Sequence, residues 1–312
     1  MRVYVEPGFI DHFLSLPKDQ NNAVKILWDI IKDYAEVTWL FNASVTFADF
    51  ERWEISNTFY SSISTKGSNQ VLLNRDFKSE ILNNNHSSQL VLAESPEPWH
   101  SEIQNHAVVL TVQKFTSVIE KMTNDFSFKF IPDDNTHWNE FSSLKHSCVR
   151  EITITDKYLI DKFLKTSDVR KLEPNFIYLL KKMLDKGDIV LNIFIKSADA
   201  DFGKYEELYK KLETLVKYTR AKVGSQIRFR IVNAELDRNY NFHDRNIFSP
   251  YFIVKAGQGF TRDYTKKINT EVESYSLFDK WGYNLIRHRR RLCNDYLMEI
   301  NAIPKAFTVY DS

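Results

Sequence analysis

Short stretches of alternating or apolar residues recur along the chain, as they do in β-strands that bury one or both faces. In the first half, this pattern predicts strands at residues 2–5, 71–73, 89–93 and 107–112. The second half is easier to divide. Its pattern predicts strands at residues 151–156, 188–195, 226–232, 241–248 and 251–255.

Other stretches carry apolar residues at helical spacing. Val24, Leu27, Trp28, Ile31 and Tyr34 recur in this way and predict a helix over residues 21–35. The same reasoning predicts helices at residues 113–122, 175–184, 205–218 and 278–300. The segment Glu6-Pro7-Gly8, between the first strand and the first of these helices, is predicted to be a turn.

This succession of strands and helices predicts an α/β protein. Residues 131–146 are polar and rich in turn formers, although Trp138 and Phe141 indicate packing there. We therefore predict two domains, residues 1–145 and 146–312. In the second, strands and helices alternate before two further strands follow directly, which predicts a mixed sheet flanked by helices.

Composition narrows the classes of function. The 312 residues include 43% hydrophobic and 27% charged residues, as expected for a globular protein. A net charge of +1 means that any anion-binding surface must be a local patch. The two cysteines, Cys148 and Cys293, are far apart and favour neither a disulfide framework nor a cysteine zinc site. No stretch has the length of a membrane span, so we expect a cytoplasmic protein without a transmembrane segment.

The most informative segment is Asn241-Phe242-His243-Asp244-Arg245, which continues to Phe248. His243 and Arg245 lie two residues apart on a predicted strand and therefore face the same side. An imidazole beside a guanidinium suits a phosphate oxyanion. The next predicted strand ends at Lys255, and Gly257 and Gly259 allow a tight turn after it. We predict a phosphate-binding hairpin; the alternative is a structural hydrogen-bond network.

A second basic segment lies in the last predicted helix, where residues 287–291 are four arginines and one histidine. Five consecutive helical positions cannot all share one exposed face, so some of these side chains must point inward or towards a partner. The alternative is a solvated basic helix end. The candidate phosphate-binding set is therefore His243, Arg245, Lys255, Gly257, Gly259, Arg287, Arg290 and Arg291, with Arg289 as a further candidate.

These motifs resemble the phospholipase D-like superfamily over residues 148–300. The likeness is to a single-copy branch, similar to the C-terminal domain of MIT-domain proteins, in which a His-Asp-Arg strand precedes an aromatic strand and a Gly-x-Gly turn. The resemblance implies that His243 is a candidate catalytic nucleophile and that a dimer-related His243 is the acid. Two departures from the catalytic pattern favour binding without hydrolysis. Arg245 replaces the usual lysine, and Ser249 and Pro250 stand where an acid is expected.

The leading hypothesis is a phosphate- or polyanion-binding protein that binds or acts on nucleic acid, of the kind found in prokaryotic defence systems. One alternative is an active, metal-independent phosphodiesterase or nuclease that works as a homodimer. Another is a lipid-headgroup or protein-interaction module, which should expose apolar side chains beside the arginine cluster. A homodimer or a subunit of a larger complex is expected, and no cofactor or metal is expected.

Acidic residues of the first half could mark a magnesium site at the ends of strands. The candidates are Glu6, Asp11, Asp49, Glu51 and Asp76. Surface acids and helix caps are the favoured interpretation. The histidines show no metal-ligand spacing, and no P-loop, Rossmann glycine pattern or Gly-x-Ser-x-Gly elbow is present.

Overall fold

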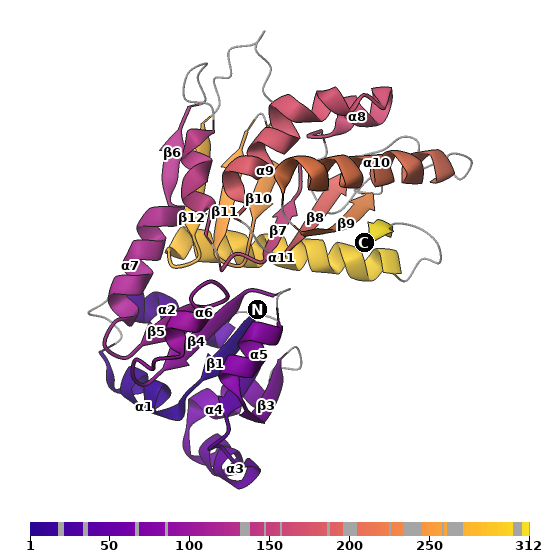
Figure 1. Ribbon diagram of the computed structural model, residues 1–312. Coiled ribbons are helices and arrows are strands. Elements are labelled where there is room, and N and C mark those ends of the chain that lie inside the picture. The colour runs from indigo at the N-terminus through magenta and orange to yellow at the C-terminus, as the bar shows by residue number, and fades with distance from the viewer. Residues whose placement is uncertain are drawn as a thin grey trace.

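The computed structural model describes residues 1–17, 22–33, 37–65, 69–84, 87–131, 138–146, 148–156, 158–185, 188–195, 205–224, 226–233, 245–257, 259–260, 271–301 and 308–311. Within these residues the chain forms two β-sheets with helices packed on them (Figure 1). The predicted α/β class is confirmed.

The first sheet has five strands, all parallel, in the order β3-β2-β1-β4-β5. Its strands are β1 (Arg2–Val5), β2 (Thr38–Asn42), β3 (Gln70–Arg75), β4 (Gln89–Ala93) and β5 (Val108–Thr111). The helices of this part are α1 (Pro7–Ser15), α2 (Asn22–Asp33), α3 (Phe47–Ser56), α4 (Thr58–Thr65), α5 (Phe77–Asn83), α6 (His100–Ile103) and α7 (Phe115–Phe126).

The predicted turn at Glu6-Pro7-Gly8 is wrong, because α1 begins at Pro7. Proline is well suited to the first helical position: its fixed φ matches the helix, and its missing N–H would have no intrahelical partner there. Two of the acidic residues of this half take part in helix capping, which confirms that interpretation for them. Asp49 takes part in a capping box with Thr46, and the Asp76 side chain accepts from the Ser79 N–H at the start of α5.

The second sheet has eight strands in the order β13-β9-β8-β7-β10-β11-β12-β6. Its strands are β6 (Phe128–Phe130), β7 (Glu151–Ile154), β8 (Ile189–Ile195), β9 (Ile227–Asn233), β10 (Arg245–Phe248), β11 (Phe252–Ala256), β12 (Val272–Ser276) and β13 (Thr308–Asp311). Strands β7, β8 and β9 are parallel to one another, and the other pairings are antiparallel. The predicted mixed sheet is confirmed.

Helices cover both faces of this sheet, as predicted. On one side lie α8 (Asp161–Thr166), α9 (Tyr178–Met183) and α10 (Tyr205–Val223), and on the other lies α11 (Lys280–Asn301) (Figure 1). The remaining helical turns are the 3₁₀ turns η1 (Asn139–Leu144) and η2 (Val169–Leu172) and the π turn η3 (Glu173–Ile177).

Strand β6 lies before the predicted domain boundary at residue 145, yet it pairs with β12 of the eight-stranded sheet. One continuous cluster of buried apolar side chains also includes residues of both halves, such as Val3 and Ile154. The division into two domains stays a prediction.

The central strands of the eight-stranded sheet have two different faces. Ile152, Leu191 and Phe229 are aligned across β7, β8 and β9, and all three are completely buried. The neighbouring rows, which point to the opposite face, are polar except at Val190. They are Glu151, Val190 and Arg228 in one row and Thr153, Asn192 and Arg230 in the next. The apolar rows face α8 to α10, and the polar rows face α11.

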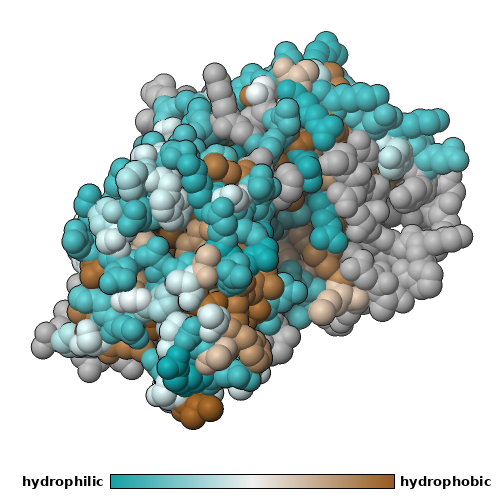
Figure 2. All heavy atoms as spheres, turned by 60° about the horizontal axis from the view of Figure 1, so that its bottom comes forward, coloured by the Kyte–Doolittle hydropathy of each residue, from teal (hydrophilic) through white to brown (hydrophobic). Residues whose placement is uncertain are grey.

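Exposed apolar side chains occur at α3, where Phe47 and Ile55 project into solvent. Figure 2 turns this end of the molecule forward and shows hydrophobic side chains among polar ones. Singly exposed apolar residues are normal on a globular surface, so they assign no function to this face.

The two sheets are joined by a buried hydrogen bond. The hydroxyl group of Tyr251 donates to the backbone carbonyl oxygen of Gln89, at 2.7 Å, and both residues are completely buried. A second bond joins the Arg150 guanidinium to the Asn105 carbonyl oxygen, at 2.7 Å. Buried polar contacts of this kind fix the relative position of the elements that they connect.

We expect Tyr251→Phe to lower the free energy of unfolding by about 1–2 kcal/mol, because the Gln89 carbonyl would stay buried without its donor. Chemical denaturation measures this change. Tyr209→Phe, at a side chain that is 42% exposed, is the control. Equal effects of the two substitutions would contradict the role given to this bond.

Candidate anion-binding site

The predicted hairpin is present in part. Strands β10 and β11 pair antiparallel, with Arg245 opposite Ala256, and Gly259 adopts a φ of 88° in the turn that follows. His243 and Asp244 lie outside the described residues. That His243 and Arg245 face the same side of one strand therefore stays a prediction.

Arg245 interacts with residues of its own chain. Its guanidinium lies over the ring of Tyr158, with 5.1 Å between the guanidinium carbon and the ring centroid. The carboxyl of Asp156, close to Arg245, is buried and accepts from the backbone N–H groups of Phe260 and Tyr158. Burial raises the pKa of Asp156, and the two N–H donors and the Arg245 charge offset part of that effect. These contacts favour a structural role for Arg245.

The structure distributes the other predicted residues over different surfaces. Lys255 is half-buried and lies opposite Glu273 of β12, and Gly257 follows β11 in a turn. On α11, Arg287 and Arg291 are exposed, Arg289 is buried and Arg290 is half-buried. The prediction that some of these arginines must point inward is confirmed.

Arg245 and Arg290 belong to opposite faces of the sheet. In β10, Ile247 pairs with Ile154, and Arg245 shares the side of Ile247 because the two are separated by one residue. Phe248 pairs with Thr153 on the other side, which is the side of α11. The predicted set is therefore not a single site, and Arg290 must be considered with different neighbours.

Those neighbours form a pocket of about 360 Å³ between α11 and the polar face of the sheet. We call it the arginine pocket and define it by six of its polar residues: Glu151, Thr153, Asn192, Arg228, Arg230 and Arg290. Ser249 and Asn294 also line it. Strand β9 supplies two of the arginines, and α11 supplies the third. Phe194, Phe248, Cys293 and Leu297 are among the other residues that line it.

Positive charge dominates the arginine pocket. Among the residues that the structure describes, neither Arg228 nor Arg230 forms an ion pair with a carboxylate. Nε of Arg230 is buried and has no hydrogen-bond partner. Among the described residues that line the pocket, Glu151 carries the one carboxylate, which accepts from Nδ2 of Asn192 at 3.2 Å. Arg228 is exposed and Arg230 is half-buried, so both side chains are accessible donors of the kind suited to phosphate oxygens.

Arg228 and Arg230 are not among the predicted site residues, although the sequence contains a signal for them. The strand over residues 226–232 was predicted from its alternation, in which Ile227, Phe229 and Ile231 are buried. The positions between them are arginines. Two arginines on one face of an otherwise buried strand indicate that this face is not apolar core.

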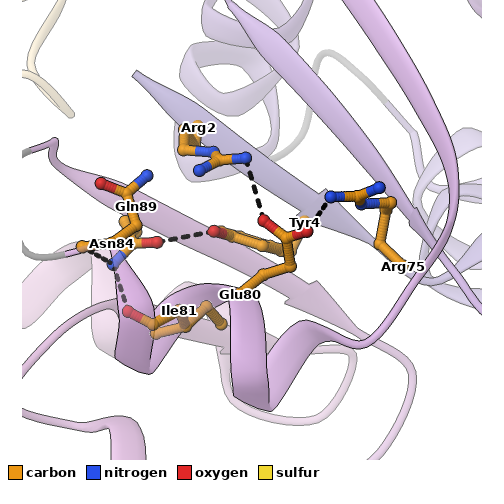
Figure 3. Close-up of polar contacts among 7 residues, drawn as sticks. All are labelled: Arg2, Tyr4, Arg75, Glu80, Ile81, Asn84 and Gln89. Carbon is orange, nitrogen blue, oxygen red and sulfur yellow. Dashed lines mark hydrogen bonds and ion pairs between the residues drawn. The ribbon is translucent and has the colours of Figure 1, made fainter.

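A second polar cluster, on the five-stranded sheet, is structural (Figure 3). The hydroxyl group of Tyr4 donates to Oε1 of Gln89 at 2.6 Å, and Nε2 of Gln89 donates to the backbone oxygens of Ile81 and Asn84. Glu80 forms ion pairs with Arg2 and Arg75. Because the Gln89 amide is completely buried and its groups are bonded within the chain, this cluster holds the sheet and leaves little for a ligand.

Two carboxylates meet where the strand order of the five-stranded sheet reverses, at the carboxyl ends of β1 and β4. Oε2 of Glu6 accepts from the backbone N–H of Glu94 at 2.7 Å. Burial raises the pKa of Glu6, and the nearby Glu94 carboxylate adds to the effect. No group of three His, Cys, Asp or Glu side chains in the described part of the chain is arranged to hold a metal ion.

No family model matches the chain, and the search of curated proteins gives no match. The phospholipase D-like resemblance stays a prediction. Within the described residues, no helix is long and apolar enough to cross a membrane.

We expect Gly259→Ala to destabilise the protein by roughly 1–3 kcal/mol, since a Cβ there adds backbone strain at positive φ and a steric clash. The added atom would lie 2.6 Å from Nη1 of Arg245 and 2.7 Å from Oδ2 of Asp156. Gly224→Ala is the matched control, because Gly224 has a φ of 72° and no atom within 4 Å of an added Cβ. Equal losses of unfolding free energy would show that only the backbone strain matters.

The thiol of Cys293, in the wall of the arginine pocket, should be inert in the native protein. Burial raises its pKa to about 12, while Arg289 and Arg290 lower it in part. At pH 8 the thiolate fraction should therefore be far smaller than for an ordinary exposed thiol. Iodoacetamide labelling followed by peptide mass spectrometry tests this expectation, with protein in guanidinium as the reactive control. Rapid native labelling would contradict it.

Proposed function

We propose that the protein binds a phosphate group of a polyanionic ligand in the arginine pocket, and that the ligand is nucleic acid. The observation that carries the proposal is the convergence of Arg228, Arg230 and Arg290 on one pocket with a single carboxylate. The choice of nucleic acid follows the combination of basic and aromatic side chains, because bases can stack on rings beside a charged groove.

This proposal changes the location of the predicted site. It keeps Arg290 and replaces the His243–Arg245 strand with Arg228 and Arg230 as the main phosphate ligands. The charge of the whole chain, +1, offers no general attraction to polyanions. A local set of guanidinium groups is therefore the required kind of surface.

We expect Arg230→Ala to weaken binding of labelled single-stranded DNA or RNA at least tenfold, because a charge-assisted hydrogen bond contributes about 1.5–3 kcal/mol. Fluorescence anisotropy at several salt concentrations measures the change, and the slope of log affinity against log salt should also decrease. Arg170→Ala is the control: Arg170 is exposed and lies on η2, on the opposite side of the sheet. Unchanged binding in Arg230→Ala would contradict the proposal.

The same nucleic acids test the catalytic alternative. Cleavage that is independent of magnesium and lost in His243→Ala would establish a phosphodiesterase. Binding without cleavage, with His243→Ala equal to wild type, would show that His243 is not required for binding, as expected if the arginine pocket is the site.

A second candidate function is contact with an anionic membrane through the outer face of α11. Arg287 and Arg291 are exposed four residues apart, and exposed Met298 continues the same face seven residues later. Trp281, near the start of the helix, is 71% exposed. Exposed apolar side chains beside the arginine cluster are the feature that the lipid alternative requires.

Sedimentation with vesicles tests this candidate. If α11 contacts lipid, vesicles that contain phosphatidylserine should bind the protein, and vesicles of phosphatidylcholine alone should not. Trp281→Ala should reduce that binding without affecting nucleic-acid affinity, whereas Arg230→Ala should have the reverse effect. No binding to either vesicle would exclude the membrane candidate.

A further inference from the structure

We infer that the arginine pocket holds a single nucleotide, with its phosphate at β9 and its sugar or base at β7. This inference rests on the proposed function and specifies the ligand of the same pocket. It depends on the order of charges across the sheet, which the strand register fixes.

Two neighbouring rows of side chains place their charged and polar groups in the same order across the sheet. In one row Glu151 of β7 is aligned with Val190 of β8 and Arg228 of β9. In the other row, two residues further along each strand, the corresponding residues are Thr153, Asn192 and Arg230. Adjacent strands lie about 4.8 Å apart, so the β7 and β9 ends of a row are separated by about 10 Å. Each row thus has a cation at one end and an oxygen acceptor at the other.

The β7 end selects against a second phosphate. An ionised carboxylate can only accept hydrogen bonds, and it repels an anion. Nδ2 of Asn192 donates to Oε1 of Glu151 and to Oγ1 of Thr153, at 3.2 and 3.3 Å, which holds both acceptors in place. The groups that fit here are hydrogen-bond donors, such as ribose hydroxyls or the exocyclic amine of a base.

The size and walls of the pocket agree with one nucleotide. Its volume of about 360 Å³ is near the lower end of the range for small-molecule sites. Phe194 and Phe248 line it with rings that are only 1% and 3% exposed, so they give the wall apolar contact with a ligand but no open stacking face. A ligand with an anion at one end and donors about 10 Å away matches a nucleoside monophosphate better than a run of phosphodiesters.

Calorimetric titration of the full chain with inorganic phosphate, ribose 5-phosphate, adenosine 5′-monophosphate and adenosine tests this inference. We expect adenosine monophosphate to bind at least tenfold more tightly than phosphate, because it satisfies both ends of the rows. Arg230→Ala should weaken both ligands. Glu151→Gln should weaken adenosine monophosphate roughly tenfold and leave phosphate unchanged.

Glu151→Gln is a conservative test, because glutamine keeps an oxygen that can accept from Asn192. Arg170→Ala is the control for a general loss of positive charge, and circular dichroism verifies that each variant is folded. If adenosine monophosphate binds no more tightly than phosphate, or if Glu151→Gln weakens both equally, the inference is wrong. Phosphate binding that depends on Arg230 would still support the proposed function. If phosphate does not bind, both the inference and the proposed function are wrong.

The nucleotide could be free or could be the end of a strand, and competition separates the two. A 5′-phosphorylated oligonucleotide that displaces adenosine monophosphate, while the unphosphorylated oligonucleotide does not, identifies a strand end. Displacement by neither identifies a free nucleotide. Both results agree with the inference, and the second contradicts the choice of nucleic acid in the proposed function. A closed single-stranded circle that competes as well as the linear phosphorylated strand would show that internal phosphates bind, which overturns it.

Discussion

The arginine pocket depends on the unequal faces of strands β7, β8 and β9. Each strand alternates between apolar and polar residues, and the register places apolar residues beside apolar ones. Isoleucine, leucine and phenylalanine therefore share one face. The face towards α8 to α10 is thereby a continuous apolar layer, and burying it stabilises the fold. The opposite face does not have to provide that burial. It can carry two arginines, an asparagine and a glutamate at fixed separations, which a strand holds more rigidly than a loop would.

Helix α11 converts this polar face into a pocket, because it is anchored on both sides of Arg290. Near its start, the hydroxyl group of Tyr283 donates to the backbone oxygen of Asp29, at 3.1 Å. Further along, the Tyr296 hydroxyl donates to the backbone oxygen of Asn233 at the end of β9, at 2.6 Å. The first bond connects α11 to α2, beside the five-stranded sheet, and the second connects it to the strand that carries Arg228 and Arg230. The third arginine is thus positioned relative to the other two by buried contacts at some distance from them.

Alternation and apolar spacing were sufficient to predict much of the local structure. The predicted strands at residues 2–5 and 89–93 coincide with β1 and β4, and the predicted helix at residues 205–218 lies within α10. Strand β2, with Trp39 and Phe41, strand β12 and the edge strands β6 and β13 were not predicted, because such short segments become strands only when they pair with distant neighbours. Strand order is also non-local. For that reason Arg245 and Arg290 could be predicted as basic candidates for one site, but the sequence does not show that they lie on opposite faces of one sheet.

The charge of the pocket bears on the kind of ligand that it can hold. Three arginines and one glutamate give the six defining residues a formal charge of 3 − 1 = +2, in a chain whose total is +1. Proteins that follow a nucleic-acid backbone neutralise on the order of 6–10 phosphates, and their affinity falls steeply with salt. A pocket with charge +2 can neutralise only one or two phosphate charges, so its affinity must come largely from directed hydrogen bonds and from burial of the rest of the ligand. If the pocket binds phosphate as proposed, its charge suits one phosphorylated unit, such as the end of a strand, better than a run of phosphodiesters.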